Sequence, residues 1–355
     1  MLKIQCSIEY ESKVIYAYIS QYYIMIPQIS FPQPIVLVSR CLEFEKVRYD
    51  GQVIHCQAVR DLESFVDFIK VCPEVDIGLG VPRDTLRIVK TKGEYRLVQP
   101  KTGNDVTEKM DEFTDSFLEE LSEVDGFIFK SKSPTIGIRD IKVYSGLSNA
   151  GVIERGSGFF ADKILKRYGG YPIEEDDRLR NVRIRHDFLT RLFAFADFRE
   201  ALDSSNMEQL VEYNRRYHYL FMLYSQPLAN KMNSLIEGSQ GAAFNEVSGE
   251  YFTLLKEVFS NHPFSKSYVN MAQNIYSGFK EQATAEDDFL FKDVINLYSH
   301  NLVGVGAVLE MLKFFVGKFA SEASAYSRFF EPYPAELKME VDPGRDKDYW
   351  EHFHF

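Results

Sequence analysis

Short apolar runs that end in polar residues constrain the fold of this chain most. Residues 35–38 (Ile-Val-Leu-Val), 68–71 and 127–129 have the length and composition of strands, and continuous apolar runs are typical of strands buried on both faces of a parallel sheet. Helical spacing of apolar residues lies between them, at 57–67 and 106–121. This alternation predicts an α/β fold, a Rossmann-like domain with parallel central strands.

The first half of the chain also contains a predicted hairpin and a predicted helix cap. Residues 86–90 and 95–98 flank Gly93 and predict a hairpin. Asn104 or Asp105 is placed to cap the helix that follows.

The pattern changes near residue 151. Gly151, Gly156 and Gly158 predict a mobile linker, and helical periodicity then predicts an all-α domain. Its helical runs cover about 188–196, 207–224, 246–260, 265–282 and 287–328.

We therefore expect four parts: an N-terminal extension, 1–31; the α/β domain, 32–150; the helical domain, 151–337; and a loose tail, 338–355, containing Trp350. The extension is either an additional packed element or a segment preceding a natural start at Met25.

Composition narrows the class of protein. Of 355 residues, 45% are hydrophobic, which is enough to form cores and argues against wholesale disorder. No apolar run is long enough to cross a bilayer, and no signal-peptide pattern is present, so we expect a cytoplasmic protein. The four cysteines, none spaced as CxxC, favour reduced thiols over a disulfide scaffold or a classical zinc site. The net charge of -11 favours solubility but leaves room for a local basic face.

Polar residues follow three of the predicted strands. Cys41, Cys72 and Ser133 each come just after a strand, and ligands of open α/β sheets bind beyond the carboxyl ends of the strands. We expect these positions to converge on one rim. Cys72 precedes a proline, as some iron–sulfur ligands do. The alternative is that both cysteines are small buried hydrophobic residues and that Glu74 is a surface carboxylate.

Three other groups of residues leave alternatives open. His55 and Cys56 are possible metal ligands whose spacing fits no standard site. The glycine-rich residues 77–83 form either a structural turn or a loop that brings Arg83 to an anion. Aromatic residues interleave with cations at 214–219, which suits either RNA contact or a core.

The densest basic run lies early in the helical domain. It comprises Arg178, Arg180, Arg183, Arg185, His186 and Arg191. These side chains form either a solvated face balanced by the acidic residues 174–177 or a contact surface for an RNA backbone.

Several motifs of the first half resemble the 2-thiouracil desulfidase family, in the same order and at similar spacing. They are Val38-Ser39-Arg40-Cys41, Val47-Arg48-Tyr49-Asp50-Gly51, Val71-Cys72-Pro73-Glu74-Val75, Gly78-Leu79-Gly80-Val81-Pro82-Arg83 and Lys130-Ser131-Lys132-Ser133-Pro134. The second half, with residues 156–160, 178–193 and 329–334, resembles the YbgA-like helical domain often fused to that family. Together the resemblance covers roughly residues 32–337.

The resemblance implies a 4Fe-4S cluster on three cysteines, with an open iron that takes the sulfur of a thiolated base before water replaces it. Two-domain members resemble enzymes that convert 4-thiouridine in tRNA to uridine. By motif match, Cys41 and Cys72 would be cluster ligands, Glu74 the acid/base and Ser133 a helper at the base. A further set would bind the substrate: Arg48, Lys130 and Lys132.

The chain departs from this pattern at the third cysteine. The family turn ends Ser-Pro-Ser-Cys-Gly, whereas this chain has Ser133-Pro134-Thr135-Ile136-Gly137, and an isoleucine side chain cannot ligate iron. The first hypothesis is a desulfidase acting on thiolated uracil or on 4-thiouridine in tRNA, with a substitute ligand or with Ile136 as a change in one isolate. The second is an inactive relative that binds RNA or acts as a scaffold. The oligomeric state is not predicted.

Overall fold

The computed structural model of the chain describes residues 30–147, 150–319 and 327–339. Most of the predicted N-terminal extension, the tail with Trp350, and Cys6 lie outside the described residues. Within the described part, no helix is both long enough and apolar enough to cross a bilayer.

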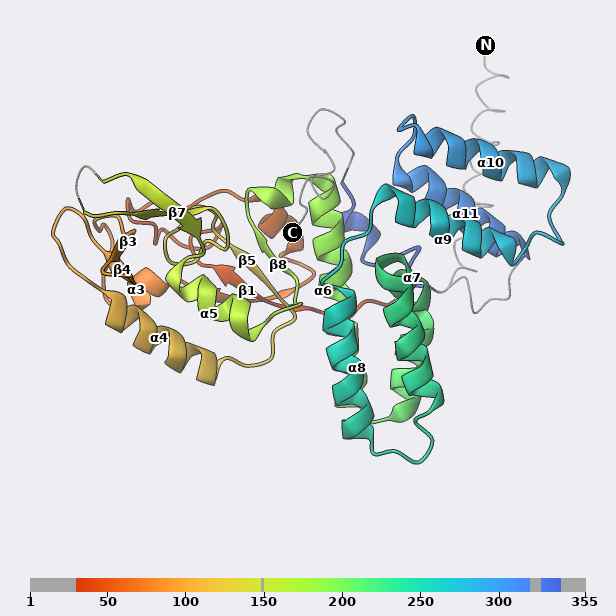
Figure 1. Ribbon diagram of the computed structural model, residues 1–355, viewed down its shortest axis with the longest axis horizontal. Coiled ribbons are helices and arrows are strands. Elements are labelled where there is room, and N and C mark those ends of the chain that lie inside the picture. Colours follow the sequence, from red (N-terminus) through yellow and green to blue (C-terminus); the bar gives the residue numbers. More distant parts are fainter. Residues whose placement is uncertain (1–29, 148–149, 320–326, 340–355) are drawn as a thin grey trace, which may run out of the picture. The chain divides into compact units, whose positions relative to one another are not determined.

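A four-stranded parallel sheet forms the centre of the first region (Figure 1). Its strands are β1 (Ile35–Ser39), β2 (Asp67–Val71), β5 (Gly126–Phe129) and β8 (Ile173–Glu175), in the order β2-β1-β5-β8. Leu37 of β1 lies opposite both Ile69 and Phe127, and all three pairings in the sheet are parallel. The apolar runs of β1 and β5 are buried because they occupy the middle of this sheet. The predicted α/β fold with parallel central strands is confirmed.

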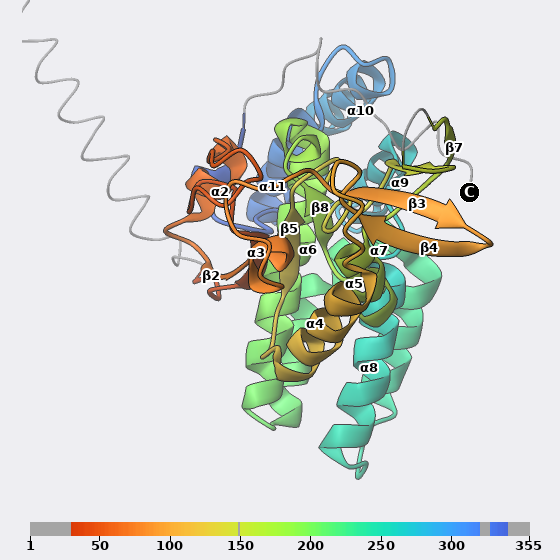
Figure 2. The same cartoon turned by 90° about the vertical axis from the view of Figure 1, so that its left-hand side faces the viewer.

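A second sheet has the order β4-β3-β6-β7. Its strands are β3 (Arg87–Thr91), β4 (Glu94–Val98), β6 (Ile141–Tyr144) and β7 (Val152–Gly156). Strands β3 and β4 form the predicted antiparallel hairpin (Figure 2), turning at Gly93 with a positive φ of 89°. The prediction of a mobile linker at Gly151–Gly158 is wrong, because β7 pairs with β6. Gly158 is also tightly packed against the backbone of Thr135, because a Cβ at position 158 would lie 2.4 Å from the Thr135 carbonyl oxygen.

Helices of the first region are α2 (Gln57–Leu62), α3 (Pro73–Asp76), α4 (Thr107–Glu120) and α5 (Phe159–Arg167). Neither candidate cap of α4 is its N-cap residue, which is Val106, but Asp105 lies next to it and its Oδ1 accepts bonds from the backbone N–H and the hydroxyl of Thr107. Phe160 of α5 packs in the same core as Phe127 and Phe129. Since β8 pairs with β5, the sheets extend beyond residue 150, the boundary expected from sequence.

The rest of the described chain is helical, as predicted. Its helices are α6 (Val182–Asp203), α7 (Met207–Glu237), α8 (Phe244–Val258), α9 (Ser265–Ser277), α10 (Ala285–Ser299) and α11 (Val305–Phe319), with short 3-10 turns at Arg178–Arg180 and Ala335–Leu337. The expected single run at 287–328 contains two helices, α10 and α11, separated by a turn. Helix α7 is kinked at Ser225, two residues before Pro227, because proline disrupts the preceding helical turn.

Helix α6 packs directly on the parallel sheet. A Cβ at Gly126 would lie 2.7 Å from the Leu192 side chain, so glycine permits this close approach of strand and helix. Arg199 donates to both carboxylate oxygens of Asp125 at 3.0–3.2 Å, and Asp125 accepts the backbone N–H of Ile35 at 2.8 Å. A largely buried ion pair therefore joins α6 to the start of β1.

Candidate active site

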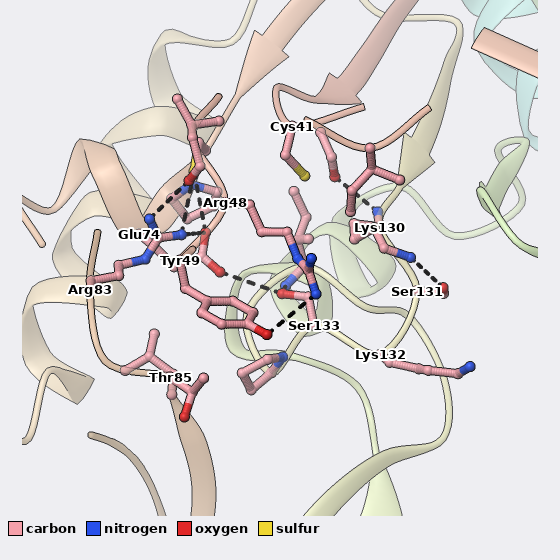
Figure 3. Close-up of a pocket in the computed structure, with 18 of the residues that line it drawn as sticks. Cys41, Arg48, Tyr49, Glu74, Arg83, Thr85, Lys130, Ser131, Lys132 and Ser133 are labelled. Atoms are coloured by element: carbon pink, nitrogen blue, oxygen red, sulfur yellow. Dashed lines mark hydrogen bonds and ion pairs between the residues drawn. The ribbon is translucent and has the colours of Figure 1, made fainter. Parts of the chain in front are cut away.

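One cavity lies beyond the carboxyl ends of β1, β2 and β5 (Figure 3). Its volume is about 410 Å³, within the range of small-molecule sites. The strand ends contribute Ser39, Cys41, Cys72, Glu74, residues 130–134 and Ile136. The predicted convergence of Cys41, Cys72 and Ser133 is confirmed, because parallel neighbouring strands bring their ends to the same edge.

The turn after β5 is fixed by groups from two other strands. Ser39 Oγ accepts the backbone N–H of Lys130 at 2.9 Å, which joins the ends of β1 and β5. Asp176, buried just after β8, accepts the Ser131 N–H and pairs with Lys130 Nζ, both at 2.8 Å. Lys130 is therefore paired with a buried carboxylate, whereas the Lys132 side chain is 85% exposed and extends outward (Figure 3).

Glu74 connects three segments of the cavity wall. It lies in the first turn of α3, directly after Pro73, which starts this short helix. Its Oε1 accepts from the hydroxyls of Ser133, at 3.4 Å, and Thr135. Its Oε2 lies 3.5 Å from Cys72 Sγ and 3.8 Å from Arg83 Nη2. The carboxylate is thereby oriented by two hydroxyls and a guanidinium.

Thr135 was not singled out from the sequence. It is fully buried, and its hydroxyl also lies 2.8 Å from Ser133 Oγ. The available signal was weak: a second hydroxyl two residues after Ser133 in a turn next to the predicted site.

The two cavity cysteines are protonated thiols at neutral pH. Burial raises the pKa of Cys41 to about 11 and that of Cys72 to about 12, and the negative charge of Glu74 adds to both increases. Both thiols are free of disulfides. Because metals bind thiolates, an ion at this position would have to displace these protons.

The position expected to supply a third thiolate is Ile136. Its side chain is 4% exposed, lines the cavity and belongs to the hydrophobic core of the α/β region. The cavity wall therefore offers the thiols of Cys41 and Cys72 and the Glu74 carboxylate. Among the described residues, no group of three His, Cys, Asp or Glu side chains could hold a metal ion. These residues do not fit a cluster held by three cysteines.

Cys56 does not replace the missing ligand within this structure. It is buried at the start of α2, where its N–H donates to Glu43 Oε1, and it is not part of the cavity wall. His55 is 76% exposed and lies 3.4 Å from Glu43 Oε2. Both residues of the metal site suggested by the sequence therefore contact Glu43, but Cys56 is buried whereas His55 is exposed to solvent.

The glycine-rich loop is a turn that also positions a cation. Gly78 and Gly80 have positive φ values of 87° and 69°, which favour glycine. Arg83 donates to the carbonyl oxygens of Val47 at 2.9 Å and Gly80 at 3.1 Å, and its buried guanidinium lies beside Glu74. Both interpretations of this loop therefore describe part of its role.

The outer wall carries further polar side chains. Arg48 pairs with Asp50 at 2.8 Å and lies 4.8 Å from the centre of the Tyr49 ring. Tyr49, Thr85 and Asp177 also line the cavity. Sequence reasoning did not single out these last three, because none follows a predicted strand directly.

The basic run of residues 178–191 does not form one surface. Arg185 is buried and pairs with Asp61 at 3.0 Å, and Arg191 donates to the carbonyl oxygens of Gly170 and Tyr171. Arg178 pairs with Glu174 at 2.9 Å. Arg185 and Arg191 are therefore largely withdrawn from solvent, whereas Arg180 and Arg183 are exposed, and RNA contact by this run stays a prediction.

The aromatic and basic residues at 214–219 do not form one surface either. Tyr217 is buried in the helical core. Arg215 pairs with Glu212, and Arg216 pairs with Asp197. This segment is core and ion pairs rather than an open row of cations.

Two family models match the chain. Residues 36–176 match a family described as 2-thiouracil desulfurase, and residues 218–334 match a family described as a protein of unknown function, DUF1722. The first match ends at Asp176, just after β8, and so spans the parallel sheet.

Relatives of the first region are also found. The uncharacterized protein YbbK of Bacillus subtilis (strain 168) is 29% identical over 154 residues, which cover 41% of this chain and 99% of that protein. A solved structure of a 4Fe-4S-dependent thiouracil desulfidase, TudS, is 29% identical and covers 42% of this chain and 94% of that chain, with a TM-score of 0.31. The chain is therefore similar to 2-thiouracil desulfurases over residues 36–176 and to the DUF1722, or YbgA-like, family over residues 218–334.

Proposed function

We propose that this protein removes sulfur from a thiolated uracil, with 4-thiouridine in tRNA as the substrate. The observation that carries the proposal is the convergence of Cys41, Cys72, Glu74 and Ser133 from three strand ends in one cavity. The family match of residues 36–176 supports the same chemistry, since that family is described as a 2-thiouracil desulfurase.

The reaction we propose is a hydrolysis. Water adds its oxygen to the ring carbon, the carbon–sulfur bond breaks, and the products are uridine in the tRNA and hydrogen sulfide. Glu74 is placed to take the proton from the attacking water, because Ser133 and Thr135 hold its carboxylate in position. Arg83, 3.8 Å from Glu74, helps to hold the same carboxylate in position.

The relative of known structure depends on a 4Fe-4S cluster. Such a cluster would supply a soft Lewis acid for sulfur. With Ile136 in the cavity wall, we assign this chain no step on a cluster and restrict the roles to Glu74, Ser133 and the neighbouring cations.

Exposed cations beside the cavity support a polynucleotide as the carrier of the base. Lys132 and Arg180 lie 3.7 Å and 3.6 Å from Asp177, which itself lines the cavity. They stand where a phosphate backbone would pass while one base enters the cavity. Arg48 lies on another part of the same wall.

A second candidate function is recognition of the thiolated base without removal of its sulfur. Ile136 favours it, because this side chain places an aliphatic group where the family pattern has a thiolate. Under this alternative, the cavity and its cations bind the base and the chain releases no sulfide.

One anaerobic experiment separates the two functions. The protein is incubated with tRNA containing 4-thiouridine, and released sulfide and tRNA nucleosides are measured, with binding measured in parallel. Sulfide release matched by conversion of 4-thiouridine to uridine supports the first proposal. Salt-sensitive binding that prefers thiolated over unmodified tRNA, without sulfide, supports the second. Absence of both binding and sulfide release overturns both proposals.

A further inference from the structure

A second cavity lies in the helical region. Its volume is about 240 Å³, and it shares no lining residue with the cavity at the strand ends. Three helices begin at its wall, since Val182 of α6, Ser265 of α9 and Val305 of α11 all line it. We refer to it as the helix-start cavity.

The starts of α9 and α11 make part of this wall electropositive. The first amides of a helix lack intrahelical acceptors, and the helix dipole adds a partial positive charge there. The residue before α9, Phe264, makes no side-chain cap. At α11 the wall contains Gly304, Val305 and Gly306, so backbone amides are near the surface of the cavity. Helix α6 contributes less, because the Asn181 side chain already accepts two of its amides.

A buried guanidinium provides independent evidence for an acceptor in this cavity. Arg185 lines the wall and is 3% exposed. Its Nη2 donates to Asp61 at 3.0 Å, but its buried Nε has no hydrogen-bond partner in the described part of the chain. An unpaired buried donor is unfavourable, and a bound anion would pair it. Two exposed cations, Arg183 and Lys338, line the same cavity.

The carboxylates of the wall leave room for an anion. Asp187 accepts from Tyr224 Oη at 2.6 Å and lies 3.6 Å from Arg191 and 3.3 Å from His262 Nδ1, so its charge is compensated within the protein. Glu310 is the other lining carboxylate and is exposed to solvent. Of these two carboxylates only Glu310 is open to solvent, and the exposed Lys338 lies on the same wall.

The other lining side chains are largely aromatic. They include Tyr224, Tyr268, Tyr298, Phe330 and Tyr333. Tyr268 and Tyr298 meet edge to face at 6.5 Å, and Tyr333 Oη is 2.7 Å from His186 Nδ1. Aromatic walls with a few polar groups suit a planar heteroaromatic ring, which stacks on them and is held at its edge.

We propose that the helix-start cavity binds a nucleoside monophosphate. Its phosphate lies at the starts of α9 and α11, within reach of Arg185 and Lys338, and its base lies among the tyrosines. This site is independent of the function proposed for the strand-end cavity, because the two cavities share no lining residue.

The test uses uridine monophosphate as the probe and isothermal titration of the full chain. Lys338→Glu reverses an exposed charge on the cavity wall and is expected to weaken binding by about tenfold or more, as loss of a charge-assisted contact does. Lys280→Glu is the matched control, because Lys280 is an exposed lysine beyond the far end of α9 that does not line the cavity. Lys132→Glu makes the same charge change at the strand-end cavity. Both of these variants are expected to bind as the unchanged protein does.

Uridine and inorganic phosphate, titrated separately, are each expected to bind more weakly than the monophosphate. Hydrogen exchange locates the ligand, with protection expected at 182–187 and 304–310. No binding of the monophosphate at millimolar concentration overturns the proposal. It is also overturned if Lys132→Glu weakens binding while Lys338→Glu does not, because the ligand then occupies the strand-end cavity.

Discussion

The two cavities differ in how their walls are built. The strand-end cavity lies where three parallel strands end, and the charges that shape it are paired, Asp176 with Lys130 and Glu74 beside Arg83. The helix-start cavity lies where helices distant in sequence begin, and its wall includes a buried nitrogen of Arg185 that has no partner among the described residues. Topology alone places the first cavity, whereas only tertiary packing creates the second.

The cavities share one electrostatic property. Burial favours the neutral forms of two thiols and one imidazole, raising the pKa of Cys41 and Cys72 and lowering that of His186 to about 4. The consequences differ, because a neutral thiol resists metal binding while a neutral imidazole accepts or donates a hydrogen bond to Tyr333. The predictions below test each cavity separately and then the contact between the two regions.

The largest change is expected from Ile136→Cys. This variant supplies a third thiol to the wall that holds Cys41 and Cys72. After anaerobic reconstitution it is expected to bind about four iron atoms per chain, as a 4Fe-4S cluster requires, whereas the unchanged chain binds far less. Iron, acid-labile sulfide and the electron paramagnetic resonance spectrum of the reduced protein measure the difference.

Ile138→Cys is the control for that variant. Ile138 is buried in the same turn but does not line the cavity, so a thiol there is expected to add no iron. A full cluster in the unchanged chain would contradict the interpretation, because another group would then replace the missing thiolate.

Glu74→Gln tests the strand-end cavity as a catalytic site. If Glu74 takes the proton from water, sulfide release is expected to fall by about 10²- to 10⁴-fold. Glu63→Gln changes an exposed carboxylate of the same region and is expected to retain activity. Equal rates for Glu74→Gln and the unchanged chain would remove this residue from the reaction.

Arg199→Met tests the contact between the regions. It leaves the buried Asp125 carboxylate without its cation, which is expected to cost about 3–5 kcal/mol in the free energy of unfolding. Chemical denaturation measures this loss. The double variant with Asp125→Asn is expected to be less destabilised than the sum of the single variants, and simple additivity would show that the pair is not coupled.

His186 is expected to make stability depend on pH in the helix-start cavity. Its pKa is lowered from 6.5 to about 4 by burial, so the unfolded chain binds a proton that the folded chain excludes. Its contribution to stability is therefore complete above pH 6.5 and is lost as the pH falls towards 4, by about 3 kcal/mol in total. His186→Gln is expected to flatten this part of the profile. An unchanged slope between the two pH values would assign the dependence to other groups.

Local sequence was enough to predict most of the elements and one important absence. The apolar runs at 35–38 and 127–129 predicted buried parallel strands, and this placed Cys41, Cys72 and Ser133 at one rim. The identity of Ile136 is sufficient by itself to show that one expected iron ligand is missing. The glycines at 151–158 were misinterpreted, because glycine marks close packing as well as mobility and spacing does not separate the two.

Only the tertiary structure determined which residues distant in sequence pair with one another. Thr135 reaches Glu74, Asp176 reaches Lys130, and Arg185 reaches Asp61 across more than a hundred residues. The sequence of a helix start or a basic run is the same whether its side chains face solvent or a neighbouring element, so charge density at 178–191 could not distinguish an RNA surface from buried ion pairs. The strands follow from local patterns, but the order of the strands and the partner of a buried charge are set by packing between segments that are distant in the chain.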